Sequence, residues 1–572
     1  MKLLHKRTGG AFSTCKFLIL LIFACFALTA CLSTEPVSEV EPLPFTKGVN
    51  MTDWFGTGTD GLPDLNKYDE ADFACLKSMG VDVIRLPIMF EFQMEPINTG
   101  KVNDVVLEKL DQVCDWAEKY QIYLVIDDHS FGAIEIQNTI PPETYETHLK
   151  ALWPQLAQRY KNRSEYIIYE IKNEPPKNLL DCWDKIQREI LAIIRQYDTK
   201  HTVVVTCANF DSLDDLVNMK PYEDPNLIYA FHFYEPGPFT NQGTHGPAQD
   251  VKYLPFPYDK SRMPELNPSL GWFGKIEIEE KYPQQGTVKY INSQIKKVAT
   301  WAKKNNVRVW AGEIGAAARS MPVDRLVWMN TTVAALNEYN IPYCTWGIDF
   351  DFGFLETEDL SLIFPDDIDQ YALEAYGFKM PDESLVANAN LELKAFPQKP
   401  YVVYDGLAAK GTSTKSMFNV KSATTDDSHK LCAKVSYPVQ SSNFLLTLPK
   451  KVLSKVIENH NAYSISFAVK FTSAKQEFRL NLADSDEEGF LPWNLGFTIK
   501  ASDYKVGEWV TVEIPLSNFK ESGGWSSKEN KWLDPRGEFD WNRFKTLHFD
   551  FDDWQNRNTG DIYLDDIVIK QK

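Results

Sequence analysis

Residues 167–175 read IIYEIKNEP, and residues 307–315 read VRVWAGEIG. In each stretch a run rich in apolar and β-branched residues, typical of a buried strand, leads into a glutamate, Glu174 in the first and Glu313 in the second. In a barrel of parallel strands, the carboxyl ends of all strands meet at one face. If both runs are strands of such a barrel, the two glutamates lie at the same opening.

Six further strand-like runs accompany these two, so the sequence predicts eight strands. The runs are Phe45–Asn50, Val83–Pro87, Tyr123–Asp127, Ile167–Ile171, Val203–Thr206, Ile228–Phe233, Val307–Ala311 and Tyr343–Trp346. Apolar residues recur at helical spacing between them, and strands that alternate with helices indicate a parallel α/β sheet. Eight such units predict a (β/α)₈ TIM barrel over residues 45–380. A doubly wound sheet is the competing fold, but no glycine-rich phosphate turn follows the first strand.

The pattern changes after residues 381–400, which we interpret as a linker. Apolar and polar residues then alternate strictly, as in residues 463–471, where every second residue is aromatic or β-branched. This period is typical of half-buried strands. The predicted fold class is therefore an α/β barrel followed by an all-β jelly-roll or β-sandwich domain over residues 401–572.

The first 30 residues resemble the signal peptide of a bacterial lipoprotein. A basic start precedes the apolar run 17–27 and the sequence Leu28-Thr29-Ala30-Cys31. The apolar run is short for a membrane-spanning helix. We expect cleavage before Cys31, acylation of its thiol and a flexible tether over residues 31–44. This predicts an exported protein, anchored by lipid in the bacterial cell envelope at the outer membrane or cell surface. A cleaved signal without lipid is the alternative.

Composition limits the classes of partner. A net charge of −19 repels nucleic acids and anionic polysaccharides, whereas a neutral polysaccharide is indifferent to that charge. The 15 tryptophans suit sugar binding, because an aromatic ring packs against the apolar face of a pyranose. The cysteines after Cys31 are singly placed and form no C-x-x-C motif, so the sequence predicts neither a zinc site nor a dense disulfide framework.

Six of the eight predicted strands end in polar or aromatic residues. These residues are Arg85, His129 in the run Asp127-Asp128-His129, Asn173 with Glu174, His232 with Tyr234, Glu313, and Trp346. Residues at the carboxyl ends of barrel strands point into the site. A single such residue is more often structural, but the whole set favours chemistry. Two carboxyl groups across a sugar-sized gap are the minimum equipment for breaking a glycosidic bond.

This ordered set resembles that of glycoside hydrolase family 5, whose members are (β/α)₈ barrels. The resemblance implies that Glu174 is the acid/base and Glu313 the nucleophile of a retaining double displacement, without a cofactor. It also implies six substrate-binding residues, Arg85, His129, Asn173, His232, Tyr234 and Trp346. In the retaining mechanism the two carboxyl groups lie about 5–5.5 Å apart. Arg85 and Tyr234 are expected to favour the ionised form of Glu313.

We expect the substrate to be a neutral β-linked polysaccharide or oligosaccharide. Internal β-1,4-glucosidic bonds of cellulose or a related β-glucan are the leading choice, because cellulases dominate the family. A β-mannanase, a xyloglucanase and a β-1,3-glucanase are alternatives on the same barrel. A non-catalytic, glycan-binding surface lipoprotein is an alternative of another class, but it would not need both glutamates. We expect no nucleic-acid partner, membrane contact only through the lipid anchor, and a monomer.

The C-terminal domain resembles a carbohydrate-binding module. Its tryptophans are Trp493, Trp525, Trp532, Trp541 and Trp554. Trp525 and Trp532 lie in Gly-, Ser- and Lys-rich surroundings, so we expect these two to be exposed. The acidic strand ends Asp550, Asp552, Asp553, Asp565 and Asp566 suit a structural calcium ion, although exposed acidic turns explain them equally well. In the barrel, the long insertion 235–286 is expected to form a wall of the cleft, with Trp272 as a sugar platform.

Overall fold

The computed structural model describes residues 41–572 except for 57–62, 133–137, 245, 268–269, 350, 356–363, 389–390, 417–419, 426–427, 437–441, 485–492, 527–530 and 553–558. The predicted signal peptide, Cys31 and most of the predicted tether lie outside the described residues, as do Trp554 and Asp553. Within the described ranges, no helix is both long and apolar enough to span a bilayer.

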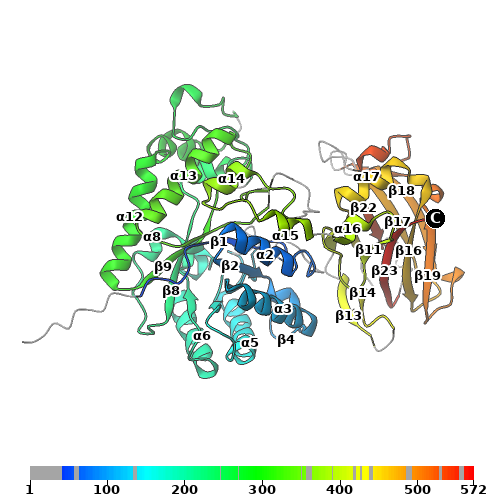
Figure 1. The fold of residues 1–572 in the computed structure, drawn as a ribbon, viewed down its shortest axis with the longest axis horizontal. Helices are drawn as coiled ribbons and strands as arrows, with labels where there is room; N and C mark the ends of the chain where they lie inside the picture. The colour runs from blue at the N-terminus through cyan, green and yellow to red at the C-terminus, as the bar shows by residue number, and fades with distance from the viewer. Residues whose placement is uncertain are drawn as a thin grey trace, which may run out of the picture. The chain divides into compact units, whose positions relative to one another are not determined.

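Eight parallel strands close into a barrel, as the sequence predicts (Figure 1). In order around the barrel they are β1 (Lys47–Asn50), β10 (Tyr343–Thr345), β9 (Arg308–Ile314), β8 (Leu227–Phe233), β7 (Val203–Val205), β6 (Ile167–Glu170), β5 (Tyr123–Asp128) and β2 (Val83–Ile88). All eight predicted runs contain a strand. Strand β9 extends past the predicted end at Ala311, so Glu313 is part of the strand.

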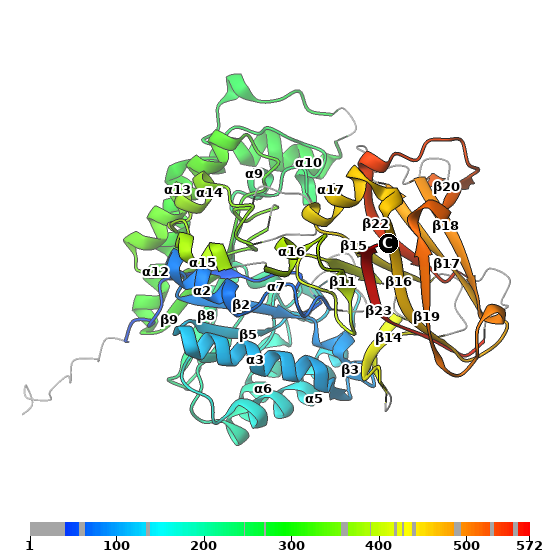
Figure 2. The same ribbon diagram turned by 45° about the vertical axis from the view of Figure 1, so that its right-hand side comes forward.

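Helices surround the barrel strands (Figures 1 and 2). The longer ones are α2 (Glu70–Met79), α3 (Asp104–Tyr120), α5 (Pro142–Tyr160), α6 (Trp183–Tyr197), α12 (Val288–Asn305) and α13 (Pro322–Glu338). Shorter ones are α8 (Leu213–Leu216), α9 (Gly237–Thr240), α10 (Trp272–Lys275), α11 (Tyr282–Gln285) and α14 (Gln370–Ala375). The segment α7 (Ala208–Asp211) belongs to the loop after β7, because Asn209 and Phe210 have left-handed backbone angles. Local sequence sets their ends: Asp69 caps the start of α2 in a capping box with Asp72, and Thr287 caps α12.

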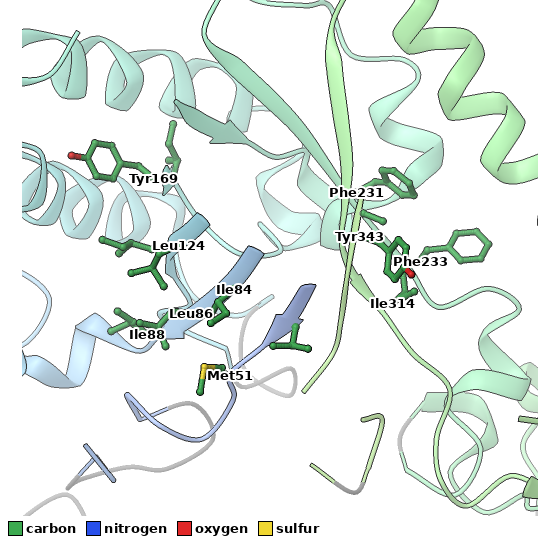
Figure 3. Close-up of a cluster of buried hydrophobic side chains, with 14 of the residues drawn as sticks. Met51, Ile84, Leu86, Ile88, Leu124, Tyr169, Phe231, Phe233, Ile314 and Tyr343 are labelled. Carbon is green, nitrogen blue, oxygen red and sulfur yellow. The ribbon is translucent and has the colours of Figure 1, made fainter. Parts of the chain in front are cut away.

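Alternate side chains of each barrel strand face opposite sides of the wall. In β2, Ile84, Leu86 and Ile88 belong to a large apolar cluster (Figure 3). This cluster also includes residues of the surrounding helices. Val83 instead belongs to a separate cluster whose other buried members are Phe45, Val125, Ile168, Val204, Ile228, Ala230, Trp310 and Cys344. This second cluster fills the barrel interior, because its members alternate with the outward-facing residues.

On four strands, the next inward-facing residue toward the carboxyl end is polar. The step of two residues leads from Val83 to Arg85, from Val125 to Asp127, from Ile168 to Glu170 and from Ala230 to His232. All four polar residues are buried. The apolar interior cluster therefore forms a floor beneath a polar layer at the carboxyl ends of the strands.

The C-terminal region folds into two antiparallel sheets, as the sequence predicts (Figure 2). One sheet has the order β13 (Val420–Thr424), β14 (Leu431–Ser436), β23 (Asp561–Gln571), β16 (Tyr463–Phe471) and β19 (Trp509–Pro515), with β11 (Tyr401–Tyr404) also paired to β23. The other has the order β12 (Ser413–Ser416), β15 (Asn443–Thr447), β22 (Phe544–Asp550), β17 (Glu477–Asp484), β18 (Trp493–Lys500), β20 (Lys520–Ser526) and β21 (Lys531–Leu533). The connection between β15 and β16 contains α17 (Lys450–Glu458).

Burial along β16 differs from the half-exposed strand that its alternating sequence predicts. Ser464, Ser466 and Ala468 are buried like the aromatic residues between them. The strand is central, between β23 and β19, and the Ser464 hydroxyl donates to Glu513 Oε1 at 2.9 Å. Pairing on both sides and contacts such as that with Glu513 therefore bury this face, which the sequence of one strand does not reveal.

The segment 381–400, interpreted from sequence as a linker, contains two short helices, α15 (Glu383–Asn388) and α16 (Leu391–Ala395). Leu393 and Phe396 are buried in the sandwich core, and the ring of Phe396 stacks on Tyr463 with centroids 5.7 Å apart. The end of this segment is thus packed as part of the sandwich.

Candidate active site

Arg85 lies in the centre of the polar layer and contacts three carboxylates. Its Nε and Nη2 donate to the two oxygens of Glu170, each at 2.8 Å. Its Nη1 donates to Glu313 Oε1 at 2.8 Å, and its Nη2 lies 3.1 Å from Asp127 Oδ2. The guanidinium holds these groups in a fixed planar geometry. Arg85 therefore locks the position of Glu313 relative to the barrel wall.

A chain of hydrogen bonds runs from Arg85 to Asp127. Arg85 Nη2 donates to Asn173 Oδ1 at 2.8 Å, Asn173 Nδ2 lies 3.2 Å from His129 Nε2, and His129 Nδ1 lies 2.8 Å from Asp127 Oδ2. Burial and the nearby Arg85 lower the pKa of His129 well below its usual value, so the ring is neutral. The geometry fits a ring that donates from Nδ1 and accepts from Asn173 at Nε2. The second Asn173 amide hydrogen is the one that can serve a substrate hydroxyl.

A β-bulge turns Glu313 toward His232. The register of β8 and β9 shifts at His232, which pairs with Glu313 and leaves Gly312 as the extra residue. A side-chain carbon at Gly312 would lie 3.2 Å from His232 Nε2, so glycine lets the ring approach the strand without a tight contact. Asn50 Nδ2 donates to the Gly312 carbonyl at 3.0 Å and thereby fixes the bulge.

Glu174 and Glu313 meet at His232. His232 Nδ1 lies 2.8 Å from Glu174 Oε1 and 3.5 Å from Glu313 Oε2. A carboxyl oxygen of Glu174 lies within 4.8 Å of a carboxyl oxygen of Glu313. Carboxyl pairs of inverting glycosidases are about 6.5–9.5 Å apart, whereas those of retaining enzymes are about 5–5.5 Å apart. The observed approach matches the retaining arrangement.

Burial raises the pKa of Glu313 to about 7, although His232, Arg85 and the Tyr234 hydroxyl each act to lower it. The Tyr234 hydroxyl donates to Glu313 Oε2 at 2.7 Å. From the sequence, Arg85 and Tyr234 were expected to favour the ionised carboxylate, and both act in that direction. The loss of hydration at a buried carboxylate outweighs them. The ionised form of Glu313 therefore predominates only above about pH 7.

Trp346 follows β10 and stacks on the His129 ring, with centroids 5.4 Å apart and an angle of 17° between the planes. Its half-buried indole is connected to Asn173 through the His129 ring, which contacts both residues. The sequence-predicted site residues are thus brought into one connected group.

A cavity of about 250 Å³ adjoins Glu174. Glu174, His232 and Tyr234 line it together with Asn209 and Phe210 from the loop after β7. The cavity gives Glu174 contact with space outside the buried polar layer, and the Glu174 side chain is 20% exposed compared with 5% for Glu313.

Sequence reasoning did not predict Asn50, Glu170 or Asp211 as members of the site. Glu170 could have been predicted from the sequence, because it is a charged residue in an apolar strand and lies two residues after Ile168, on the same inward-facing side. Asn50 ends the first strand and could have been grouped with the other polar strand ends. Asp211 lies in a loop, and nothing in the surrounding sequence indicates that it contacts Glu174.

The outer face of the seven-stranded sheet carries a groove of about 930 Å³. Trp525 and Trp532 are directly opposite each other on β20 and β21, and their exposed fractions are 46% and 41%, as the sequence predicts. The remaining lining is mostly polar: Asn443, Glu477, Phe478, Arg479, Thr498, Ser522, His548, Asp550 and Asp552. Two aromatic faces beside hydrogen-bonding groups are suited to a neutral sugar chain.

Other predicted groups have less defined surroundings. Trp272 is 78% exposed on α10, and its role as a sugar platform stays a prediction. His429 Nδ1 lies 2.8 Å from Asp565 Oδ2 and 3.5 Å from Asp566 Oδ2, whereas Asp552 accepts a bond from the Ser442 main chain. A structural calcium ion in the sandwich also stays a prediction. No disulfide bond joins any two of the six cysteines within the described ranges.

A parallel barrel with two closely spaced carboxyl groups at the carboxyl ends of its strands defines a retaining glycoside hydrolase. The chain belongs to the cellulase family, glycosyl hydrolase family 5, whose sequence model matches residues 45–351. Residues 392–571 match the model of carbohydrate binding domain 30.

The chain is also similar to several curated endoglucanases. The chain is 29% identical to Endoglucanase 3 of Fibrobacter succinogenes, over 57% of this chain and 53% of that protein. It is 25% identical to Endoglucanase C of Acetivibrio thermocellus, over 54% of this chain and 93% of that protein. Endoglucanase H of the same organism is 23% identical over 87% of this chain and 51% of that protein. The chain thus spans about half the length of two of these relatives and nearly all of Endoglucanase C.

Replacing Tyr234 with phenylalanine tests the balance of forces on Glu313. Tyr234→Phe removes the hydrogen bond that stabilises the carboxylate, so the pKa of Glu313 rises. The acid limb of kcat/KM should move to higher pH by roughly 0.5–1 unit, because one such bond contributes about 1 kcal/mol. The measurement is the pH dependence of kcat/KM on a soluble cello-oligosaccharide.

Tyr222→Phe is the matched control, because it removes a buried hydroxyl that accepts from Gln187 Nε2 at 2.9 Å and leaves Glu313 untouched. Its acid limb should stay in place. An unmoved limb in Tyr234→Phe would contradict the assignment of that limb to Glu313.

Proposed function

We propose that this protein is an endo-acting β-1,4-glucanase that cleaves cellulose or a related β-glucan with retention of configuration. The observation that carries the proposal is the close approach of Glu174 and Glu313 at the mouth of a family 5 barrel. Glu313 is the nucleophile and Glu174 the acid/base in this proposal. Hydrogen bonds from Arg85 and Tyr234 stabilise the negative charge on Glu313. The greater exposure of Glu174 suits an acid/base, which first protonates the leaving group and then activates a water molecule.

In the first step, an oxygen of Glu313 attacks the anomeric carbon while Glu174 gives its proton to the departing glycosidic oxygen. One C–O bond forms and one breaks, and a glycosyl ester on Glu313 results. Asn173, held by Arg85 and His129, donates to the sugar 2-hydroxyl, an interaction that strengthens in the transition state.

In the second step, Glu174 takes a proton from water as the oxygen of that water attacks the anomeric carbon. The ester bond to Glu313 breaks, and Glu174 is protonated again. Two inversions at the same carbon give net retention. His232 contacts Glu174 and lies close to Glu313, so it is placed to keep both carboxyl groups in register throughout.

Glucan is favoured as the substrate because the named relatives are endoglucanases. No observation in the site favours mannan, xyloglucan or a β-1,3-glucan over it. A purely glycan-binding role is less well supported, since such a protein would not need two glutamates held by a network of buried hydrogen bonds.

Hydrolysis of a polysaccharide panel tests the activity. The protein should rapidly lower the viscosity of soluble cellulose derivatives and release short cello-oligosaccharides, with much slower action on mannan, xyloglucan and laminarin. Glu313→Ala should reduce kcat by at least about 10⁴-fold, and azide should restore part of the turnover on an activated glycoside with inverted product. Near-normal activity of Glu313→Ala, or mannan as the preferred polymer, would refute the respective assignment.

The sandwich is proposed to hold the enzyme on its polysaccharide through the groove on the seven-stranded sheet. The support is the match to a carbohydrate-binding family together with the exposed pair Trp525 and Trp532. Polar groups along β17 and β22 then serve the sugar hydroxyls, as Arg479, His548 and Asp550 line the same groove.

Removing either ring tests this binding role. Trp525→Ala and Trp532→Ala should each weaken retention on insoluble β-glucan by roughly 5- to 30-fold, because stacking of one ring contributes about 1–2 kcal/mol. Activity on soluble substrate should be unchanged. Tyr371→Ala, which removes an exposed ring of α14 outside the groove, is the matched control and should bind normally. Unchanged retention in both groove variants would leave the sandwich with a purely structural role.

The chain is also proposed to be exported and anchored by a lipid on Cys31. The support is the basic start, the short apolar run and the Leu-Thr-Ala-Cys sequence. An anchor in the cell envelope would keep the enzyme beside the cell that takes up its products.

Cys31→Ser tests the anchor. The wild-type protein should incorporate labelled fatty acid and fractionate with membranes, whereas Cys31→Ser should carry no label and leave the membrane fraction, because acylation needs the thiol. Membrane association that survives the substitution would contradict lipidation at this residue.

A further inference from the structure

We propose that Asp211 is a positioning residue that sets the place and the protonation of Glu174, acting through the Glu174 main chain and through His232. The inference rests on the proposed function, because it takes Glu174 as the acid/base.

Asp211 holds the backbone of Glu174 directly. Asp211 is fully buried, its Oδ2 accepts from the Glu174 main-chain N–H at 3.0 Å, and its Oδ1 accepts from the Cys207 N–H at 3.0 Å. Glu174 has φ of 40°, in the left-handed region that non-glycine residues rarely adopt. The bond to Asp211 therefore stabilises the unusual backbone that directs the Glu174 side chain into the site.

The loop that carries Asp211 is itself strained. Asn209, Phe210 and Asp211 have φ of 68°, 63° and 51°, three consecutive left-handed residues without a glycine. Such backbone persists only where the surroundings hold it, and it is concentrated at functional sites. Phe210 N donates to the Pro175 carbonyl at 3.1 Å, so the loop is tied to both residues of the Glu174-Pro175 pair.

His232 connects Asp211 to the carboxyl group of Glu174. Its Nδ1 lies 2.8 Å from Glu174 Oε1, and its Nε2 lies 3.8 Å from Asp211 Oδ2. The Nε2 atom is buried and has no hydrogen-bond partner among the residues that the structure describes. The 3.8 Å separation is too long for a hydrogen bond, so the interaction with Asp211 is electrostatic in this geometry.

The tautomer of His232 follows from these contacts. Burial lowers the pKa of His232 to about 4, so the ring is neutral and carries one hydrogen. A protonated Glu174 donates to Nδ1, which places the ring hydrogen on Nε2, facing Asp211. When Asp211 and Glu174 hold one proton between them, the arrangement with that proton on Glu174 leaves a negative charge on Asp211 facing the Nε2 hydrogen. This tautomer of His232 therefore supports the protonated form of Glu174 that the first chemical step requires.

The surrounding charges reinforce this effect. The charged and titratable groups that face Asp211 or His232 are Arg85, His129, Glu170, Glu174, Cys207 and Glu313. Burial and the carboxylates of Glu174 and Glu170 raise the pKa of Asp211 well above its usual value, whereas Arg85 acts to lower it. Neighbouring carboxyl groups resist losing both protons. Asp211 and Glu174 therefore retain one proton between them to a higher pH than Glu174 would alone.

Asp211→Asn tests the proposal by removing the charge with little change in size. The alkaline limb of kcat/KM should move to lower pH by about one unit, because the loss of a neighbouring negative charge makes Glu174 easier to deprotonate. At pH 8, kcat/KM on unactivated cellotetraose should fall about tenfold, whereas 2,4-dinitrophenyl β-cellobioside, whose leaving group needs no proton, should lose less than about threefold. If Asp211→Asn does not fold, Asp211→Ser takes its place with the same two readouts.

Asp198→Asn is the matched control. Asp198 is also buried, accepts from the main-chain N–H groups of Lys200 and His201 at 2.9 and 3.0 Å, and pairs with the His201 ring, but it lies before β7 at the other end of the strand. Its substitution should lower Tm, leave the alkaline limb in place and affect both substrates by the same factor.

An unmoved alkaline limb in the Asp211 variants, or equal losses on both substrates, would overturn the proposal and leave Asp211 as a structural residue. Wild-type protein that turns over neither substrate would instead count against the proposed glucanase function. The two failures are therefore distinguishable.

Discussion

The active end of the barrel depends on one buried cation. Arg85 binds Glu170 with two hydrogen bonds, reaches Glu313 with a third and lies beside Asp127. The side chains of Arg85, Glu170 and Asp127 are fully buried. Removing one partner of such a buried ionic group typically costs about 3–5 kcal/mol, because the remaining charges are left uncompensated. The guanidinium is therefore as much a part of the fold as the apolar layers, and it ties strands β2, β5, β6 and β9 together at their carboxyl ends.

The same burial imposes a conflict that the site resolves with hydrogen bonds. A nucleophilic carboxylate needs to be ionised, yet the buried position that fixes Glu313 favours its neutral form. Arg85 from β2, and His232 and Tyr234 from the carboxyl end of β8, oppose that tendency. Burial thus holds Glu313 in a fixed geometry but makes it harder to ionise. A fixed geometry is what a preorganised active site requires.

Much of this arrangement can be predicted from the sequence. The alternation of residues along each strand indicates both where the strands lie and which side chains face the site. The eight barrel strands and their strand-end residues were predicted from apolar runs followed by polar groups, and Trp525 and Trp532 were predicted to be exposed from their polar surroundings. Glu170 was overlooked although it lies on the inward period of its strand. The alternation in residues 463–471 was misleading about exposure, because burial there depends on neighbouring strands.

Other parts of the site could not have been predicted from local patterns. The bulge at Gly312 depends on the register between two strands, and Asp211 meets Glu174 only because two loops are folded against each other. Likewise, Phe396 packs into the sandwich core through long-range contacts, so the sandwich begins before the end of the predicted linker. Each of these features is set by pairing between segments that are distant in sequence.

The apolar plug below the polar layer has a consequence for the timing of proton transfer. Val83, Val125, Ile168 and Trp310 close the barrel beneath Arg85, so solvent reaches the carboxyl groups only from the rim. A polymer that occupies the rim also covers that route. The protonation states of the carboxyl groups are then set at the moment the polysaccharide binds. Solvent pH therefore acts on the free enzyme more than on the enzyme–substrate complex.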